Sequence, residues 1–339
     1  HFPASRPPAT RPGDRGRSTT VAAKLTLGEL RATKQVSPAM CADSSDDGGF
    51  HFGGNRAIAR QMPKRKRDPF LVTHDELVGR GLFLVINLRR RVDRQRQMRK
   101  LLRPMKSISW EFMAAIDGKQ LSWDHVAEHL HPKALKEALW AEKKGVPTIC
   151  RRSGSFSPHL TLSAVGCALS HRAAWAKLAA APAHVEWALI LEDDVCRVAF
   201  DFEEKLDTLV GTLPSSWRFC YLGYHESSGA MLRNGQRVRF AEVGIDETQT
   251  GLYGYLIRRA AAEGLLLKQK VVFPLRHQID VALGHVSWPI GSRFILYPDA
   301  VMLDSPRSED GACDTDVQTL GSEDKKAHGG LAGQKMLVL

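Results

Sequence analysis

The chain has 339 residues, enough for one large domain or two ordinary ones, and its 43% hydrophobic and 25% charged residues are typical of a protein with a packed core. No stretch approaches the roughly 18 apolar residues of a membrane-spanning helix, and six cysteines are too few for a disulfide scaffold. The net charge of +11 is uneven: residues 1–80 carry +6 and residues 81–106 carry +8, so the remainder is slightly acidic.

The two ends of the chain differ from its middle. Residues 1–75 are basic and rich in Arg, Pro, Ser and Gly, and residues 305–339 are polar and Gly-rich. Neither has a sustained apolar period, so we expect disordered tails around a folded part at residues 76–304. The basic run at residues 64–67 is typical of a solvated charge cluster. Nucleic-acid binding through this tail and the basic segment at residues 89–106 is a minor alternative, which salt-sensitive binding would reveal.

The folded part alternates apolar runs with helical patterns. In chain order we expect a strand at residues 82–88, a helix at 91–103, a strand at 108–116, helices within 122–143, a mobile loop at 145–159, a helix at 161–180, a strand at 187–191, a helix at 202–210, strands at 217–222 and 252–257, helices at 259–268 and 278–286, and a strand at 294–297. This alternation predicts an α/β fold with a mainly parallel sheet flanked by helices. Ligands collect at the carboxyl ends of such strands.

Three carboxylates follow the expected strand at residues 187–191. Glu192, Asp193 and Asp194 come directly after four apolar residues. Crowded carboxylates repel one another, and a divalent cation would offset that cost. Oxygen ligands suit Mg²⁺ or Mn²⁺ and do not suit zinc. The alternative is an exposed acidic turn paired with Arg197.

Several short motifs occur in a fixed order. They are Val85-Ile86-Asn87-Leu88 with Arg90, Asp93, Arg94 and Met98; Ala115-Ile116-Asp117-Gly118; Val165 to His171 (VGCALSH) with Trp175; Ala188 to Asp194 (ALILEDD); Tyr221-Leu222-Gly223; Thr250-Gly251 with Tyr253 and Tyr255; and Ile279-Asp280 with Leu283. Each motif is weak by itself, but their order and spacing over residues 81–285 resemble glycosyltransferase family 25. That family includes bacterial lipooligosaccharide galactosyltransferases and collagen galactosyltransferases.

The resemblance implies a chemistry as well as a fold. It implies a GT-A-like nucleotide-sugar-binding domain that uses a UDP-sugar donor, most often UDP-galactose, and Mn²⁺ (or Mg²⁺). It further implies transfer with inversion to a hydroxyl of a glycan, a lipooligosaccharide or other glycolipid, or a protein. Such an enzyme acts in lipopolysaccharide biosynthesis or in protein glycosylation. Its compartment would be the cytoplasm or, given an upstream signal, the endomembrane lumen.

The resemblance also implies roles for individual side chains. The metal and diphosphate carboxylates are Asp193 and Asp194, with Glu192 beside them. The other side chains expected at the donor site are Asn87, Arg90, Arg94, Asp117, Ser170 and His171. The candidate catalytic base is Asp280, with Asp246 or Glu247 behind it. Three of these side chains have a purely structural alternative: His171 as a packed helical histidine, Arg94 as a solvated arginine and Asp117 as a turn residue.

One departure from the family pattern favours a different function. Where the family usually carries Gly-Glu ahead of its Gly-Cys pair, this chain has Ser163-Ala164. The missing carboxylate is compatible with a catalytically inactive protein that binds sugar or a protein partner, as in an adhesion protein. Turnover, rather than binding, discriminates the two functions.

Overall fold

The computed structural model describes residues 78–150, 155–156, 159–227, 240–244, 247–267, 272–306 and 316–317, all within the compact unit Arg65–Leu339. The expected N-terminal tail lies outside the described residues, as does most of the segment 305–339. Within the described ranges, no helix has the length and apolar character that crossing a membrane requires.

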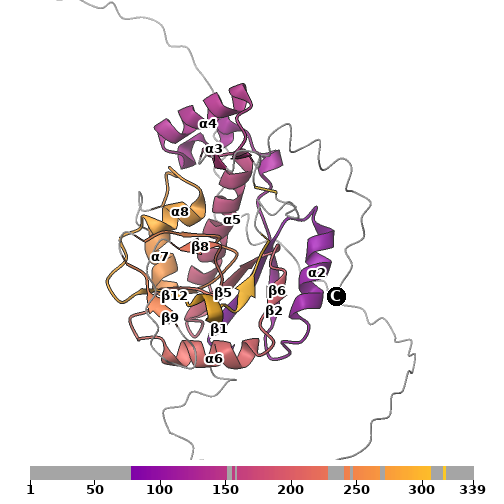
Figure 1. Cartoon of the computed structure of the whole chain (residues 1–339), viewed down its shortest axis with the longest axis vertical. Helices are drawn as coiled ribbons and strands as arrows, with labels where there is room; N and C mark the ends of the chain where they lie inside the picture. Colours follow the sequence, from indigo (N-terminus) through magenta and orange to yellow (C-terminus); the bar gives the residue numbers. More distant parts are fainter. Residues whose placement is uncertain are drawn as a thin grey trace, which may run out of the picture. The chain divides into compact units, whose positions relative to one another are not determined.

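A mixed sheet of seven strands forms the centre of the molecule (Figure 1). Its strands, in sheet order, are β2 (Trp110–Ala114), β1 (Gly81–Asn87), β5 (Trp187–Glu192), β11 (Gly254–Arg258), β7 (Phe219–Tyr221), β12 (Arg293–Leu296) and β9 (Phe240–Glu242). The pairs β1–β2, β1–β5 and β7–β12 are parallel, whereas β11 runs antiparallel to β5 and β7, and β9 to β12. The expected α/β fold is confirmed, but the sheet is mixed rather than mainly parallel.

The strand β11 runs opposite to both of its neighbours, β5 and β7. The described part of residues 222–253 contains no helix, only the short strands β8 (Glu226–Ser227), β9 and β10 (Gln249–Thr250). Strands β9 and β11 both run opposite to β7, so the chain turns back between them without a helix in the described part. In the register of β11 with β7, Tyr255 faces Tyr221.

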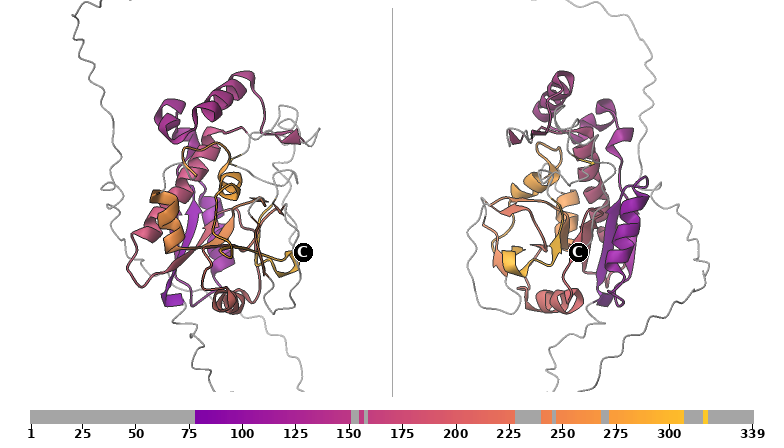
Figure 2. Two further views of the ribbon diagram at one scale, coloured as in Figure 1. Left: turned by 90° about the vertical axis from the view of Figure 1, so that its left-hand side faces the viewer. Right: turned by 45° about the vertical axis from the view of Figure 1, so that its right-hand side comes forward.

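Helices cover both faces of the sheet. One layer contains α5 (Leu162–Ala179), α7 (Arg259–Leu267) and α8 (Ile279–Gly284), and the other contains α2 (Val92–Leu102) and α6 (Phe202–Thr212). Figure 2 shows α2 standing beside the sheet on the face away from α5. Because side chains alternate along a strand, Leu84 and Ile86 of β1 pack in the α5 layer and Phe83 and Val85 in the α2 layer. Both faces of β1 are therefore buried, as its continuous apolar sequence predicts.

The remaining elements are short. They are α3 (Trp123–Val126), α4 (Pro132–Lys144), the paired strands β3 (Ile149–Cys150) with β4 (Ser155–Phe156), β6 (Arg197–Val198) with β13 (Leu303–Asp304) and β8 with β10, and the 3-10 turns Gly118–Gln120, Ala127–His129 and Pro298–Ala300. Helix α4 begins at Pro132 and ends at Lys144, before Gly145, whose φ of 63° suits glycine. Two-residue strands leave no periodic signal in the sequence, so none of the three small pairs was expected.

Two glycines bring α5 against the end of β2. A Cβ atom on Gly118 would lie 2.3 Å from the Cα of Ser163, and one on Gly166 would lie 2.6 Å from the carbonyl oxygen of Ile116. Side chains at these positions would push the helix away from the turn. The helix is fixed at its start by Thr161, whose Oγ1 accepts the N–H of Ala164 at 3.0 Å. The first turns of α5 are therefore held directly beside Asp117.

Candidate active site

A cleft lies where β1, β2 and β5 end at their carboxyl edges. Its empty volume is about 610 Å³, part of it open to solvent. The polar residues that line it are Arg90, Arg94, Asp117, Ser163, Cys167, Ser170, His171, Glu192, Asp193, Asp194 and Asp316. Parallel strands β1, β2 and β5 deliver their last residues to one edge, which is why motifs far apart in the sequence meet here.

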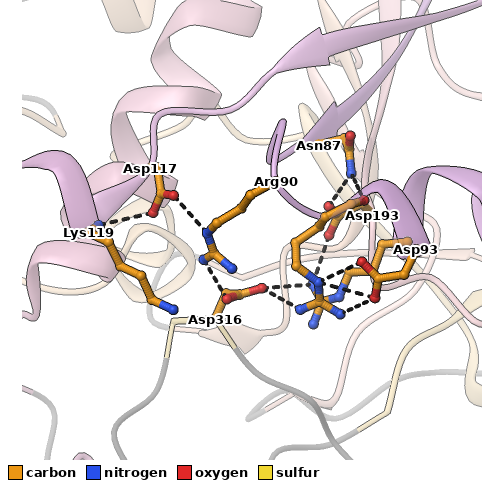
Figure 3. Close-up of polar contacts among 9 residues, drawn as sticks. Asn87, Arg90, Asp93, Asp117, Lys119, Asp193 and Asp316 are labelled. Carbon is orange, nitrogen blue, oxygen red and sulfur yellow. Dashed lines mark hydrogen bonds and ion pairs between the residues drawn. The ribbon is translucent and has the colours of Figure 1, made fainter.

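Asp193 joins β5 to the segment after β1. Its Oδ2 accepts the side-chain N–H of Asn87 at 2.6 Å and its Oδ1 accepts that of Arg94 at 2.8 Å (Figure 3). Burial raises the pKa of Asp193, and the bond to Arg94 partly offsets this effect. Each carboxylate oxygen of Asp193 therefore already accepts a hydrogen bond, Oδ2 from an amide group and Oδ1 from a guanidinium group.

Asp194 is in the opposite situation. Its Oδ1 is buried and has no hydrogen-bond partner among the described residues. Burial, reinforced by the negative charge of Glu192, raises the pKa of Asp194 to about 7. A buried carboxylate oxygen without a partner is costly. A divalent cation favours such hard oxygen ligands, so Asp194 is the residue of the triplet that fits the predicted Mg²⁺ or Mn²⁺.

A chain of buried hydrogen bonds fixes Glu192. Trp175 donates its indole N–H to the Tyr255 hydroxyl at 3.0 Å, this hydroxyl meets Nδ1 of His171 at 2.9 Å, and Nε2 of His171 meets Oε1 of Glu192 at 2.9 Å. Trp175, His171 and Tyr255 are each 0% exposed. Every proton has a partner when Tyr255 donates to Nδ1 and Nε2–H donates to Glu192, so we assign the neutral Nε2–H tautomer. We call these four residues the inner chain.

The inner chain holds the carboxylate of Glu192 in its charged form. Burial alone would raise the pKa of Glu192, but its hydrogen bond to His171 lowers it overall. Cys167 also approaches Glu192, with Sγ 3.8 Å from Oε1. Ligand atoms of Cys167, His171 and Glu192 lie within 4.8 Å of one another and could in principle hold an ion. Cys167 and His171 both already hydrogen-bond to Oε1 of Glu192, so Asp194 is the better candidate for a cation ligand.

Two arginines, Arg90 and Arg94, line the cleft, and Arg91 shares the carboxylate of Asp316 with Arg90. Arg90 donates its Nε–H to Asp117 at 2.7 Å and an Nη2–H to Asp316 at 2.6 Å, and Arg91 donates an Nη1–H to the other oxygen of Asp316 at 2.6 Å. Nη1 of Arg94 lies 4.0 Å from Oδ2 of Asp316. We call Arg90, Arg91 and Arg94 the arginine cluster. Figure 3 shows the carboxylate of Asp316 beside the guanidinium group of Arg90.

Two of the expected donor-site residues serve the scaffold around the cleft. The Oγ of Ser170 accepts the backbone N–H of Ile116 at 2.8 Å and donates to the carbonyl of Gly166 at 2.7 Å, so this buried hydroxyl ties β2 to α5. Asp117 accepts the N–H of Lys119 at 3.0 Å as well as the Arg90 side chain. Burial alone would raise the pKa of Asp117, but the Arg90 bond lowers it.

The candidate base Asp280 does not line the cleft. Its Oδ2 accepts the N–H of Gly251 at 3.1 Å and its Oδ1 the N–H of Val281 at 2.8 Å. Glu247 accepts the N–H of Gly244 at 3.1 Å, and Asp246 lies outside the described residues. Ala164 is only 2% exposed within the apolar core and does not line the cleft.

Sequence reasoning missed four residues of this site: Arg91, Trp175 as a hydrogen-bond donor, Tyr255 and Asp316. Trp175 and Tyr255 occur in the ordered motifs without an assigned role, and both are fully buried. Their polar atoms meet only because α5 packs against β11, a contact that no local pattern encodes. Asp316 lies 226 residues from Arg90 in a polar stretch without a motif.

Comparison with known proteins agrees with the motifs. Residues 82–282 match the family model described as glycosyltransferase family 25 (LPS biosynthesis protein). A protein of Acanthamoeba polyphaga mimivirus that carries the name "Putative glycosyltransferase" is 28% identical over 186 residues, which are 53% of this chain and 50% of the viral protein. The chain therefore spans about half the length of this curated relative. Because the family model covers more than half of the sequence, including all three strands that end at the cleft, the chain belongs to glycosyltransferase family 25.

Proposed function

We propose that this glycosyltransferase uses a UDP-sugar, in the first instance UDP-galactose, together with Mn²⁺ or Mg²⁺. The hexose would pass with inversion to a hydroxyl group of a glycan, a lipooligosaccharide or a protein. The observation that carries the proposal is the unpartnered, buried Oδ1 of Asp194, which lines the same cleft as Arg90 and Arg94. A site for a cation beside a site for an anion matches a metal-bound nucleoside diphosphate.

The residues of the cleft divide the work of this reaction. Asp194 would hold the cation, with Glu192 beside it, and Asp193 would join only in addition to its bonds with Asn87 and Arg94. The cation, when bound, neutralises negative charge on the departing diphosphate. The side chain of Arg94 holds Asp193 in place, and the arginine cluster offers N–H donors to phosphate oxygens.

The transfer step breaks the bond between the anomeric carbon and the diphosphate oxygen and forms a bond from that carbon to the acceptor oxygen. The acceptor hydroxyl loses its proton to a carboxylate, and UDP leaves with the electron pair. Asp280 is the proposed base: burial raises its pKa, which strengthens it as a proton acceptor, and its two backbone hydrogen bonds fix its orientation. Glu192 is the alternative base because it lines the cleft.

The test is UDP release by the purified protein. A panel of UDP-sugars is supplied with Mn²⁺, with Mg²⁺ or with EDTA, and the wild type is compared with Asp194→Asn. The matched control is Asp124→Asn, because Asp124 is an exposed carboxylate in the first turn of α3. We expect metal-dependent release that falls at least about a hundredfold in Asp194→Asn and is unchanged in Asp124→Asn. Release that is indifferent to EDTA, or full activity in Asp194→Asn, contradicts the proposal.

The base and the stereochemistry need separate measurements. With an acceptor, Asp280→Asn should lower kcat strongly while donor hydrolysis and donor binding persist; the same result in Glu192→Gln alone would move the role to Glu192. Proton NMR of the first-formed product reports its anomeric configuration. A β-linked product from an α-linked donor supports inversion, and an α-linked product contradicts it.

The alternative of an inactive binding protein depended on Ala164. In this chain Ala164 lies in the apolar core and does not line the cleft. An alanine in place of the family's usual glutamate therefore removes no carboxylate from the lining of the cleft. That position therefore lends the alternative no support.

A further inference from the structure

Asp316 is unusual among the carboxylates around the arginine cluster. Asp93 and Asp117 lie within 27 residues of the arginines that they bind, and Asp193 belongs to the neighbouring strand. Asp316 comes from 226 residues away and contacts Arg90 and Arg91 with one oxygen each. Its side chain is 13% exposed.

The contact has the form of ligand recognition. Two guanidinium groups donate to the two oxygens of one anion at 2.6 Å each, an arrangement that arginine also makes with phosphate. Burial alone would raise the pKa of Asp316, but the bonds to Arg90 and Arg91 lower it, so the group is held as an anion. A second contact lies next to it: the hydroxyl of Thr161 donates to the carbonyl of Val317 at 3.1 Å.

Charge balance decides what happens when another anion arrives. The three guanidinium groups of the arginine cluster already face four carboxylates, those of Asp93, Asp117, Asp193 and Asp316. A phosphate group placed between Arg90 and Arg91 would meet Asp316 at contact distance. Like charges at that distance repel strongly in a partly buried cleft, so the two anions exclude each other.

We propose that Arg90 and Arg91 form a binding site for a phosphate or diphosphate group, and that Asp316 occupies this site as an internal competitor which the ligand displaces. The assignment adds Arg91 to the site and gives Asp316 a regulatory role. It deepens the proposed function, on which it rests only in naming the diphosphate of a UDP-sugar as the natural ligand.

The size of the effect follows from the competition. When a site is available for only a fraction of the time, the apparent dissociation constant rises by the inverse of that fraction. If Asp316 occupies the site about nine-tenths of the time, its removal tightens ligand binding about tenfold, and an occupancy of two-thirds corresponds to about threefold.

The primary test is calorimetric binding of orthophosphate, pyrophosphate and UDP to the full chain. Asp316→Asn removes the charge and keeps the side-chain volume. The matched control is Glu111→Gln on β2, because Glu111 also pairs with a cation, Lys177 at 2.7 Å, but does not line the cleft. We expect pyrophosphate and UDP to bind Asp316→Asn about three- to tenfold more tightly, with Glu111→Gln equal to the wild type. Orthophosphate tightened equally would identify a single-phosphate site.

Two outcomes overturn the inference. Unchanged affinity in Asp316→Asn means that the carboxylate does not compete, and weaker binding means that it instead orients the arginines for the ligand. A measurement on the wild type guards against misfolding of the variant: hydrogen exchange at the amides of residues 316 and 317 should accelerate when pyrophosphate is added. Unaltered or slower exchange there also counts against displacement.

The outcomes separate this inference from the proposed function. Tighter pyrophosphate binding in Asp316→Asn, without turnover of any UDP-sugar, supports the anion site and contradicts the UDP-sugar-dependent activity. Turnover of a UDP-sugar with identical donor KM in Asp316→Asn and wild type supports the activity and overturns the competitor. If both hold, donor KM falls by the same factor as the pyrophosphate dissociation constant.

Discussion

The inner chain and the arginine cluster both contribute side chains to one cleft, by different physical means. The inner chain joins four side chains through hydrogen bonds, and three of them are completely buried. The arginine cluster makes ion pairs; the side chain of Arg90 remains 34% exposed, whereas those of Arg91 and Arg94 are 11% and 12% exposed. A buried polar group that loses its partner has no water to replace it, whereas a partly exposed charge does. The inner chain therefore fixes one geometry, whereas Arg90 can exchange partners.

The largest effect should come from cutting the inner chain at its centre. His171→Ala leaves the Tyr255 hydroxyl and the Glu192 carboxylate without their partner and opens a cavity, so we expect the free energy of unfolding to fall by about 3 kcal/mol. Urea denaturation measures it. A loss of unfolding free energy below about 1 kcal/mol would mean that the inner chain stabilises the fold no more than the ion pairs of the arginine cluster do.

Asp194 lines the same cleft, and its substitution should show whether a cation stabilises the fold there. A ligand at a hundred times its dissociation constant stabilises the folded state by about 2.7 kcal/mol. Saturating Mn²⁺ should therefore raise the melting temperature of the wild type by several degrees and leave that of Asp194→Asn unchanged. Calorimetry with and without EDTA checks this shift. An equal shift in both proteins would place the cation elsewhere.

Two neighbouring tyrosines sharpen the comparison further. Tyr255 and Tyr221 face each other across β11 and β7, and both are buried, but the Tyr221 hydroxyl has no hydrogen-bond partner among the described residues. Tyr255→Phe should cost about 1–2 kcal/mol of stability, while Tyr221→Phe should be neutral or slightly stabilising. Activity also distinguishes the two hydroxyls. Only Tyr255→Phe should lower kcat, because the Tyr255 hydroxyl positions His171 and, through it, Glu192. Equal changes in stability in the two variants would show that the hydrogen bonds of the Tyr255 hydroxyl contribute no net stability.

The smallest change in stability should come from a substitution in the arginine cluster. Arg90→Ala removes two partly exposed ion pairs, each worth less than about 1 kcal/mol, so chemical denaturation should find only a minor loss. Its effect should appear in binding instead, as a pyrophosphate affinity about tenfold weaker than that of the wild type. An Arg90→Ala variant that lost stability but kept its pyrophosphate affinity would show that the arginine cluster serves the fold rather than ligand binding.

The parts of the molecule that the sequence predicts are those with local signals. The apolar runs of β1 and β5 and the spacing in α5 place Asn87, Asp193 and His171 at one sheet edge, because parallel strands deliver their ends together. The direction of β11 was not predictable, since strand direction depends on how the chain returns through residues 222–253. The hydrogen-bond partners of Asp193 were also hidden: no local pattern pairs Asp193 with Arg94, 99 residues before it in the chain.

Other contacts also depend on long-range packing. Ser170 lines the cleft, as expected of a donor-site residue, and its hydroxyl also bonds to backbone groups of Ile116 and Gly166. A serine gives the same sequence signal in either role. For Asp316, neither period nor spacing indicated a contact with Arg90, because ion pairs across 226 residues are set by the tertiary fold alone.

The bond between Asn87 and Asp193 spans 106 residues, and this distance sets the order in which the cleft can be completed. Pairing of β1 with β5 must close a loop of that length, and such non-local contacts slow folding. During synthesis the arginine cluster emerges first, the acidic triplet about a hundred residues later, and Asp316 more than a hundred residues after that. We therefore expect a nascent chain to assemble an open cleft, which can meet its anionic ligand before the internal carboxylate exists.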